Sequence, residues 1–180
     1  MKKLAQLGAT LGREFSSTLL YAVSPWDEAT VQEGLRQLVE AEFLYQRGLP
    51  PHATYVFKHA LIQDAAYQSL LRRTRQQYHR RIAQVLEAQF PDIVATQPEL
   101  LAHHYTEAAL PGQAIGYWQQ AGQRALDRSA QVEAINHLSR GLEVLTALPE
   151  TLDRLQHELD LQIPLGAAWA RTRGWSAPEV

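Results

Sequence analysis

Cysteine is absent from the 180 residues of this chain. Disulfides, thiolate nucleophiles and zinc–thiolate sites are therefore excluded, and a reducing compartment is compatible with the sequence. Long apolar runs are absent too, because no segment approaches the roughly 20 apolar residues that span a bilayer. The first residues carry two lysines but no continuous apolar stretch of the kind found in signal peptides. We therefore expect a cytoplasmic protein without membrane contact.

Charge of one sign is not in excess either. The chain has 17 Lys and Arg against 19 Asp and Glu, a formal net charge of -2. This balance gives no global attraction to nucleic acid or to anionic membranes. Hydrophobic residues make up 46% of the chain, which is enough for a packed core and argues against disorder.

The common catalytic motifs are also missing. The sequence contains no GxxxxGK[ST] phosphate loop and no GxGxxG, HExxH or GxSxG motif. His103 and His104 are adjacent, so on a helix they point about 100° apart and are poorly placed to share a metal ion. We predict no catalytic residue, no metal site and no enzymatic activity.

The first 70 residues have the element order of a winged helix. A helical pattern of leucines opens the chain, Ser16 and Ser17 can cap a second helix, and Ser24 or Asp27 can cap a third. The segment "LYQRGLPPHATYVF" then predicts two short strands around a Gly-Pro-Pro turn. Three short helices followed by a hairpin predict a winged-helix domain over residues 1–70.

After residue 70 the pattern is helical only. Five amphipathic segments follow, with ends near Pro91, Pro111 and Pro149, and Pro164 is expected to interrupt the last one. Short connectors predict antiparallel neighbours. The apolar residues of the last segment are Leu152, Leu155, Leu159 and Ile163. With no helix after it, this segment is expected to expose an apolar face.

Two of these helices fit the tetratricopeptide template. The matching positions are Leu101, Ala102, Tyr105, Ala114, Trp118 and Ala121. A weaker match runs through Gly122, Ala125, Ala134, Leu138 and Gly141. The predicted fold is thus mostly α, a winged helix followed by a truncated, tetratricopeptide-like antiparallel array over residues 71–180, with a generic helical bundle as the alternative. We expect the array to bind a protein partner or a neighbouring copy of the chain through its concave face, with Tyr105 and Trp118 as interaction residues.

A winged helix raises the possibility of DNA binding, in which the third helix enters the major groove. In this chain that helix carries Asp27, Glu28, Glu33, Glu40 and Glu42 against a single Arg36. A charge of about -4 opposes binding to the phosphate backbone. A DNA-binding transcription regulator is therefore the alternative function, and we predict no nucleic-acid partner.

A basic cluster follows directly, formed by Arg72, Arg73, Arg75, His79, Arg80 and Arg81. One interpretation is a surface for an anion or an acidic partner, and the other is the solvated side of a helix. The second interpretation is favoured, since helix surfaces are commonly charged. Arg72, Arg73 and Arg80 are kept as candidate interaction residues.

Three segments together resemble a known family: "LGATLGREFSSTLL", "LVEAEFLYQRGLPPHATYVFKHALIQDAAYQSLL" and "PELLAHHYTEAALPGQAIGYWQQAGQRAL". They are similar to the region behind the ATPase domain in bacterial STAND-type AAA-like signalling ATPases, especially those fused to a class III adenylate/guanylate cyclase. The resemblance implies a non-catalytic signal-transduction module whose partner is the upstream ATPase domain. ATP or ADP would be bound by the parent protein, and this chain, lacking the phosphate loop, would need no cofactor and would be a fragment.

The same resemblance bears on His59, which lies in "FKHALIQD" where a strand is expected to become a helix. In related ATPases a winged-helix histidine reaches the ADP phosphate, although the neighbouring Met and Asp of that motif are not matched here. The positive end of a helix suits an anion. The resemblance therefore implies that His59 senses a nucleotide phosphate in the parent protein. The alternative is that His59 caps the helix or packs in the hairpin.

Overall fold

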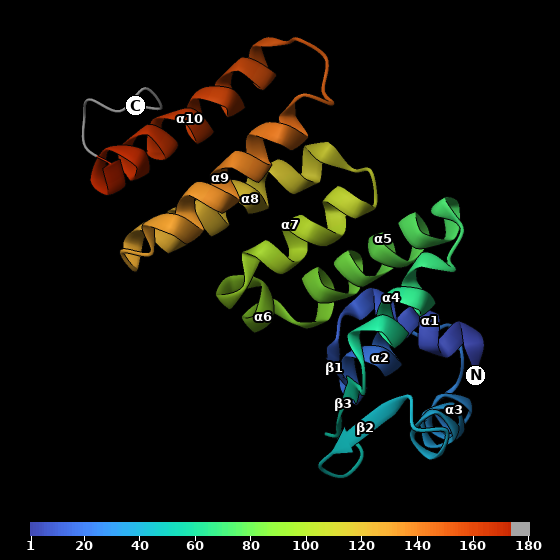
Figure 1. The fold of residues 1–180 in the computed structure, drawn as a ribbon. Coiled ribbons are helices and arrows are strands. Elements are labelled where there is room, and N and C mark those ends of the chain that lie inside the picture. The colour runs from blue at the N-terminus through green and yellow to red at the C-terminus, as the bar shows by residue number, and fades with distance from the viewer. Residues whose placement is uncertain (174–180) are drawn as a thin grey trace. The chain divides into compact units, whose positions relative to one another are not determined.

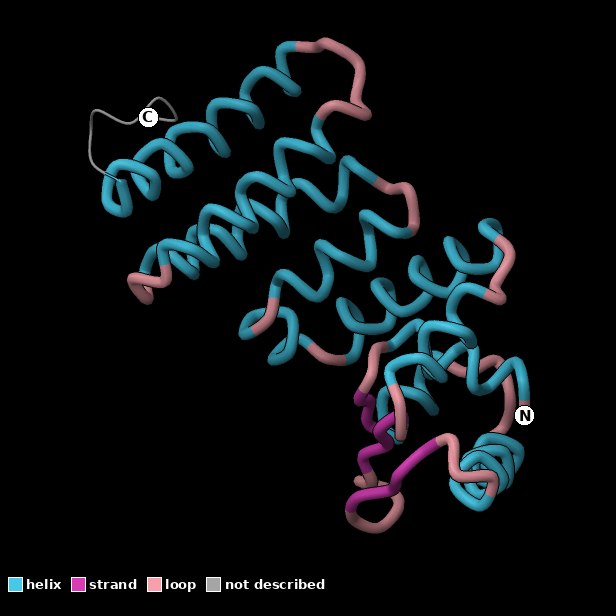
Figure 2. The backbone as a smooth tube through the Cα atoms, in the orientation of Figure 1, coloured by secondary structure: helices cyan, strands magenta, loops and turns pink. Residues whose placement is uncertain are grey.

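The computed structural model describes residues 1–173, which form two compact units, Met1–Val85 and the chain from Leu86 onward (Figure 1). The fold is mostly α with one small antiparallel sheet, as the sequence predicts (Figure 2). No helix among the described residues combines the length and apolarity needed to cross a bilayer.

The first unit has the order of a winged helix. Its elements are α1 (Lys2–Leu11), β1 (Glu14–Ser16), α2 (Ser17–Val23), α3 (Glu28–Glu40), β2 (Leu44–Arg47), β3 (Thr54–Phe57), α4 (Ala60–Gln68) and the first part of α5 (Arg72–Gln89). The strands pair antiparallel in the order β1-β3-β2. Glu14 lies opposite Val56, and Leu44 lies opposite Phe57.

Side-chain caps fix the starts of two helices in this unit. The Ser16 hydroxyl accepts from Leu19 N at 3.1 Å at the start of α2. The Asp27 carboxylate accepts from Thr30 N at 2.9 Å at the start of α3. Both predicted caps are confirmed, and of the two alternatives for α3 it is Asp27 that caps the helix. Strand β1 was not predicted, because three residues are too few to show a strand period.

Aromatic side chains from β1 and β3 form the centre of the first core. The Phe15 ring lies 6.0 Å from the rings of both Tyr55 and Phe57, measured between centroids. Helices α1 and α3 and strand β2 cover these rings with leucines: Leu4, Leu7, Leu35, Leu38 and Leu44, each at most 5% exposed.

The division between the units falls inside α5, at residues 85 and 86, whereas the sequence prediction places the domain boundary at residues 70 and 71. Arg81 gives a reason for the later division. Its Nε donates to the carbonyl of Val23 and its Nη2 to that of Ser24, which joins the middle of α5 to the end of α2.

The second unit is an array of antiparallel helices. Its elements after α5 are α6 (Pro91–Thr96), α7 (Pro98–Glu107), α8 (Pro111–Asp127), α9 (Gln131–Leu145) and α10 (Leu152–Arg173). Helix α7 packs on α8, α8 on α9, and α9 on α10. All residues of the first tetratricopeptide match are buried. The short helix α6 was not predicted. Pro91 was expected only to end the helix before it, but it also lies in the first turn of α6.

The prediction that Pro164 interrupts the last helix is wrong, because α10 continues from Leu152 to Arg173 with Pro164 inside. Leu161 and Ala168, on either side of the proline, are fully buried in the core of the array. Their packing offsets the hydrogen bond that a helix loses at proline.

Candidate functional site

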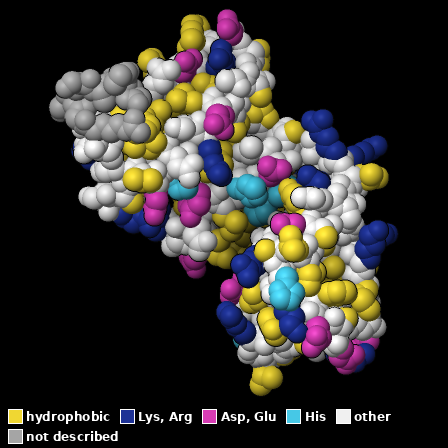
Figure 3. Space-filling model, in the orientation of Figure 1, with side chains coloured by type: hydrophobic (Ala, Val, Ile, Leu, Met, Phe, Trp, Pro, Cys, Tyr) yellow, Lys and Arg dark blue, Asp and Glu magenta, His cyan; other side chains and the backbone are white. Residues whose placement is uncertain are grey.

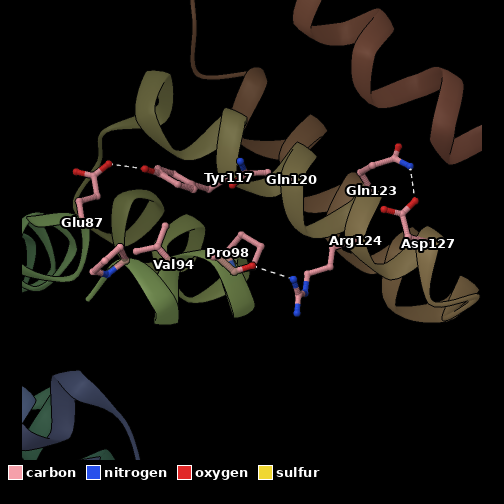
Figure 4. Close-up of a pocket in the computed structure, with 10 residues that line it drawn as sticks. Glu87, Val94, Pro98, Tyr117, Gln120, Gln123, Arg124 and Asp127 are labelled. Atoms are coloured by element: carbon pink, nitrogen blue, oxygen red, sulfur yellow. Dashed lines mark hydrogen bonds between the residues drawn. The ribbon is translucent and has the colours of Figure 1, made fainter. Parts of the chain in front are cut away.

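A groove of about 680 Å³ lies in the second unit between α6 and the outer side of α8 (Figure 4). Its apolar wall consists of Pro91, Val94, Ala95 and Pro98. Its polar wall consists of Glu87, Tyr117, Gln120, Gln123, Arg124 and Asp127. The α8 residues recur every three or four positions, which places them on one side of the helix. An apolar floor with a few fixed polar groups is typical of a binding site.

Glu87, near the end of α5, is held by two tyrosines. The Tyr105 hydroxyl donates to Oε2 of Glu87, and the Tyr117 hydroxyl donates to Oε1. The two tyrosine rings stack, with centroids 5.9 Å apart. Burial, followed by the hydrogen bond to Glu87, raises the pKa of Tyr117 to about 12, so Tyr117 stays a donor at neutral pH. The Glu87 carboxylate is thus held in a fixed orientation on an exposed residue.

Arg124 and Asp127 form the polar part of the groove farther along α8 (Figure 4). Arg124 Nη1 donates to the carbonyl of Ala95 at 2.8 Å, while its buried Nε has no partner among residues 1–173. Asp127 accepts from Gln123 Nε2 at 2.9 Å. The groove therefore offers a carboxylate at each end, Glu87 and Asp127.

The predicted interaction residues Tyr105 and Trp118 lie inside the array, 4% and 3% exposed. Trp118 Nε1 donates to Thr106 Oγ1 at 3.0 Å, and its ring stacks on His137 with centroids 5.8 Å apart. Trp118 thus joins α7, α8 and α9. Tyr105 contacts two residues of the groove, Glu87 through its hydroxyl and Tyr117 through its ring. A role of either residue in partner binding stays a prediction, and its buried position makes that role an indirect one.

The predicted basic residues Arg72, Arg73 and Arg80 are exposed on α5. Lys and Arg side chains gather on the surface where α5 begins (Figure 3). Arg75 makes a cation–π contact within the chain, since its guanidinium lies 4.3 Å from the centroid of the Tyr67 ring. Within the described residues none of Arg72, Arg73 and Arg80 forms a salt bridge, which leaves both the solvated and the partner-binding interpretations open.

His59 occupies the residue before α4 and is exposed. Its backbone is extended, with φ of -132° and ψ of 141°, and its side chain makes no capping hydrogen bond. His59 is the N-cap residue of α4 through its backbone carbonyl, which accepts from Ile62 N at 3.0 Å, but its imidazole does not cap the helix. Its position at the start of a helix keeps the imidazole accessible to an anion.

Replacing His59 by alanine should therefore leave the free energy of unfolding within about 0.5 kcal/mol of wild type, as at other exposed sites. Urea unfolding followed by circular dichroism measures this. A loss of more than about 1 kcal/mol would indicate a structural cap instead.

The groove residues Glu87, Tyr117 and Arg124 were not found from sequence. Glu87 lies 18 residues before Tyr105 and 30 before Tyr117 in the chain. These separations follow no helix period, because the turn through α6 and the packing of α7 on α8 bring the side chains together. The tetratricopeptide template matched Trp118, the residue next to Tyr117. On a helix, adjacent side chains point about 100° apart, so Tyr117 lies on a different side of α8 from Trp118.

Comparison with known proteins gives one relative to report. Over 151 residues, which are 83% of this chain, the chain is 28% identical to an uncharacterised protein of Rhizobium meliloti (strain 1021). The chain spans only 15% of the length of that relative. No family model matches the chain. No solved structure matches it.

Proposed function

We propose that this chain is a non-catalytic regulatory and protein-interaction module of a STAND-type signalling ATPase, of the kind linked to a class III nucleotide cyclase. The groove between α6 and α8 is the observation that supports a role in protein interaction. The resemblance of the sequence motifs supports the assignment to signalling ATPases. The match to a segment of a much longer protein is compatible with a module of a multidomain protein.

The groove suits a partner segment that carries a basic residue next to an apolar one. Glu87 forms no salt bridge within the part of the chain that the structure describes, and each of its oxygens accepts one tyrosine hydroxyl. A carboxylate has about four acceptor positions, so two remain for a Lys or Arg of the partner.

The charge of α3 disfavours the alternative of a DNA-binding regulator. Arg36, the cation of this helix, forms salt bridges with Glu33 at 2.6 Å and with Glu40. Glu28 and Asp27 add further negative charge at the start of α3. A helix whose arginine is already paired with carboxylates has no cation left to neutralise a DNA phosphate.

In the proposed parent protein, His59 would contact the nucleotide phosphate when the ATPase domain is closed on the winged helix. The exposed imidazole beside the first turn of α4 supports this role. ATP or ADP would be the cofactor of the parent protein.

Selection of a random peptide library on phage against the full chain tests the groove. We expect enriched peptides with a Lys or Arg beside an apolar residue. Replacing Glu87 by glutamine keeps the shape of the side chain but removes its charge. A charge-assisted hydrogen bond contributes about 1.5–3 kcal/mol, so the selected peptides should bind E87Q roughly tenfold more weakly or worse. Fluorescence anisotropy of labelled peptides measures the dissociation constants.

The matched control is Glu143→Gln, because Glu143 is an exposed glutamate of α9 outside the groove. Binding to E143Q should equal binding to wild type. Enriched peptides without basic residues, or equal affinities for wild type and E87Q, would contradict the proposed use of the groove.

A further inference from the structure

Helix α10 exposes a stripe of large apolar side chains. We call it the α10 stripe, and it consists of Leu152, Leu155, Leu159 and Ile163. Intervals of three and four residues place these side chains on one line of the helix. Their exposed fractions are 85%, 51%, 51% and 70%, whereas Leu161 and Ala168 on the packed side are 0% exposed. Hydrophobic side chains reach the surface in the region of α10 (Figure 3).

Carboxylates border the α10 stripe on both sides. At about 100° per residue, Asp153 and Asp160 fall on one side and Glu158 falls on the other. Gln156 Nε2 donates to Asp160 Oδ1 at 2.9 Å, and Gln162 Nε2 donates to Glu158 Oε1 at 2.9 Å. These glutamines hold a carboxylate beside the stripe on each side.

These carboxylates are not neutralised by cations of the same segment. Arg154 is the only Lys or Arg between residues 152 and 163. Its Nε donates to the carbonyl of Leu145 at 3.2 Å, and its Nη1 lies 3.6 Å from a carboxylate oxygen of Glu150. The surface around the stripe is therefore apolar in the middle and acidic at both edges.

We propose that the α10 stripe docks an amphipathic helix of a partner protein, with Lys or Arg on both sides of that helix's own apolar stripe. Apolar packing would supply affinity. Pairing of the partner's Lys or Arg with the carboxylates beside the stripe would fix the orientation of the partner helix. Two copies of this chain fit poorly, because parallel or antiparallel pairing of α10 places acid opposite acid. This site is separate from the groove between α6 and α8 and does not depend on the function proposed for it.

The proposal is tested with a synthetic helical peptide of about five turns that is titrated into the full chain. The peptide is made of Leu, Ala and Lys, with lysines on both sides of a leucine stripe. Its counterpart has Glu in place of every Lys. We expect the lysine peptide to bind, the glutamate peptide to bind at least about tenfold more weakly, and added salt to reduce the difference. Isothermal titration calorimetry measures both affinities.

The double variant Leu155→Gln/Leu159→Gln should weaken the lysine peptide by about tenfold or more. Val132→Gln on α9 is the matched control, since Val132 is 77% exposed and lies outside the stripe. Circular dichroism checks that both variants keep their helix content. Absence of lysine-peptide binding, equal binding of both peptides, or unchanged binding to the double variant would overturn the proposal. So would sedimentation showing a dimer that the double variant dissociates and that excludes the peptide.

Discussion

Replacing Phe57 by alanine is expected to lower the free energy of unfolding of the first unit by about 3–5 kcal/mol, as for other buried aromatic residues. Phe57 is 1% exposed and its ring contacts Phe15 in the centre of the winged-helix core. Phe15 in turn lies against α1, where a Cβ on Gly8 would come within 2.8 Å of its ring. A cavity at this point cannot collapse easily, because β3 is paired with β1 on one side and with β2 on the other.

Phe43→Ala is the matched control, since it removes the same ring from a position that is 42% exposed. Its loss should stay within about 1.5 kcal/mol because less apolar surface returns to water. Hydrogen exchange of the β3 amides locates the effect. Equal losses for Phe43→Ala and Phe57→Ala, or unchanged exchange in β3 of the Phe57 variant, would show that the aromatic cluster is not the centre of this core.

The overall fold could be predicted from the sequence because its signals are local. Ser16 and Asp27 act as caps whose acceptor atoms lie three residues from the amides they bind. The tetratricopeptide positions recur at helix spacing within α7 and α8. The failures are also local in origin. Helix α5 ends before Pro91 as predicted, but α6 was missed because a proline is also accepted in the first turn of a new helix. Pro164 was predicted to interrupt the last helix, yet packing carries α10 through it.

The groove could not be predicted in the same way. Three helices contribute its polar cluster of Glu87, Tyr105 and Tyr117. No spacing in the sequence predicts that the two tyrosine hydroxyls donate to the Glu87 carboxylate. The apolar stripe of α10 was predicted to be exposed, which the structure confirms, but the residues of the packed face of α10 were not predicted. A stripe of leucines normally marks the packed face, whereas here Leu161 and Ala168 form that face and the stripe lies opposite to it.

Replacing Gly122 by alanine is expected to destabilise the array by about 1–2 kcal/mol, although alanine favours helices. A Cβ at Gly122 would lie 2.5 Å from both Cγ and Cδ2 of Leu138. Leu138 is fully buried, so its side chain has no free space into which it can move. The cost of forcing α8 and α9 apart therefore exceeds the gain of about 1 kcal/mol in helix propensity.

Gly116→Ala, in the same helix, should have the opposite sign. Nothing lies within 4 Å of the Cβ that it would add, so only the helix propensity changes, and stability should rise by about 0.5–1 kcal/mol. Urea unfolding of both variants measures the difference. Stabilisation by both substitutions would show that α8 and α9 do not approach closely at Gly122. Destabilisation by Gly122→Ala alone would establish the close approach of the Leu138 side chain to α8 at Gly122, on which the packing of α8 against α9 depends.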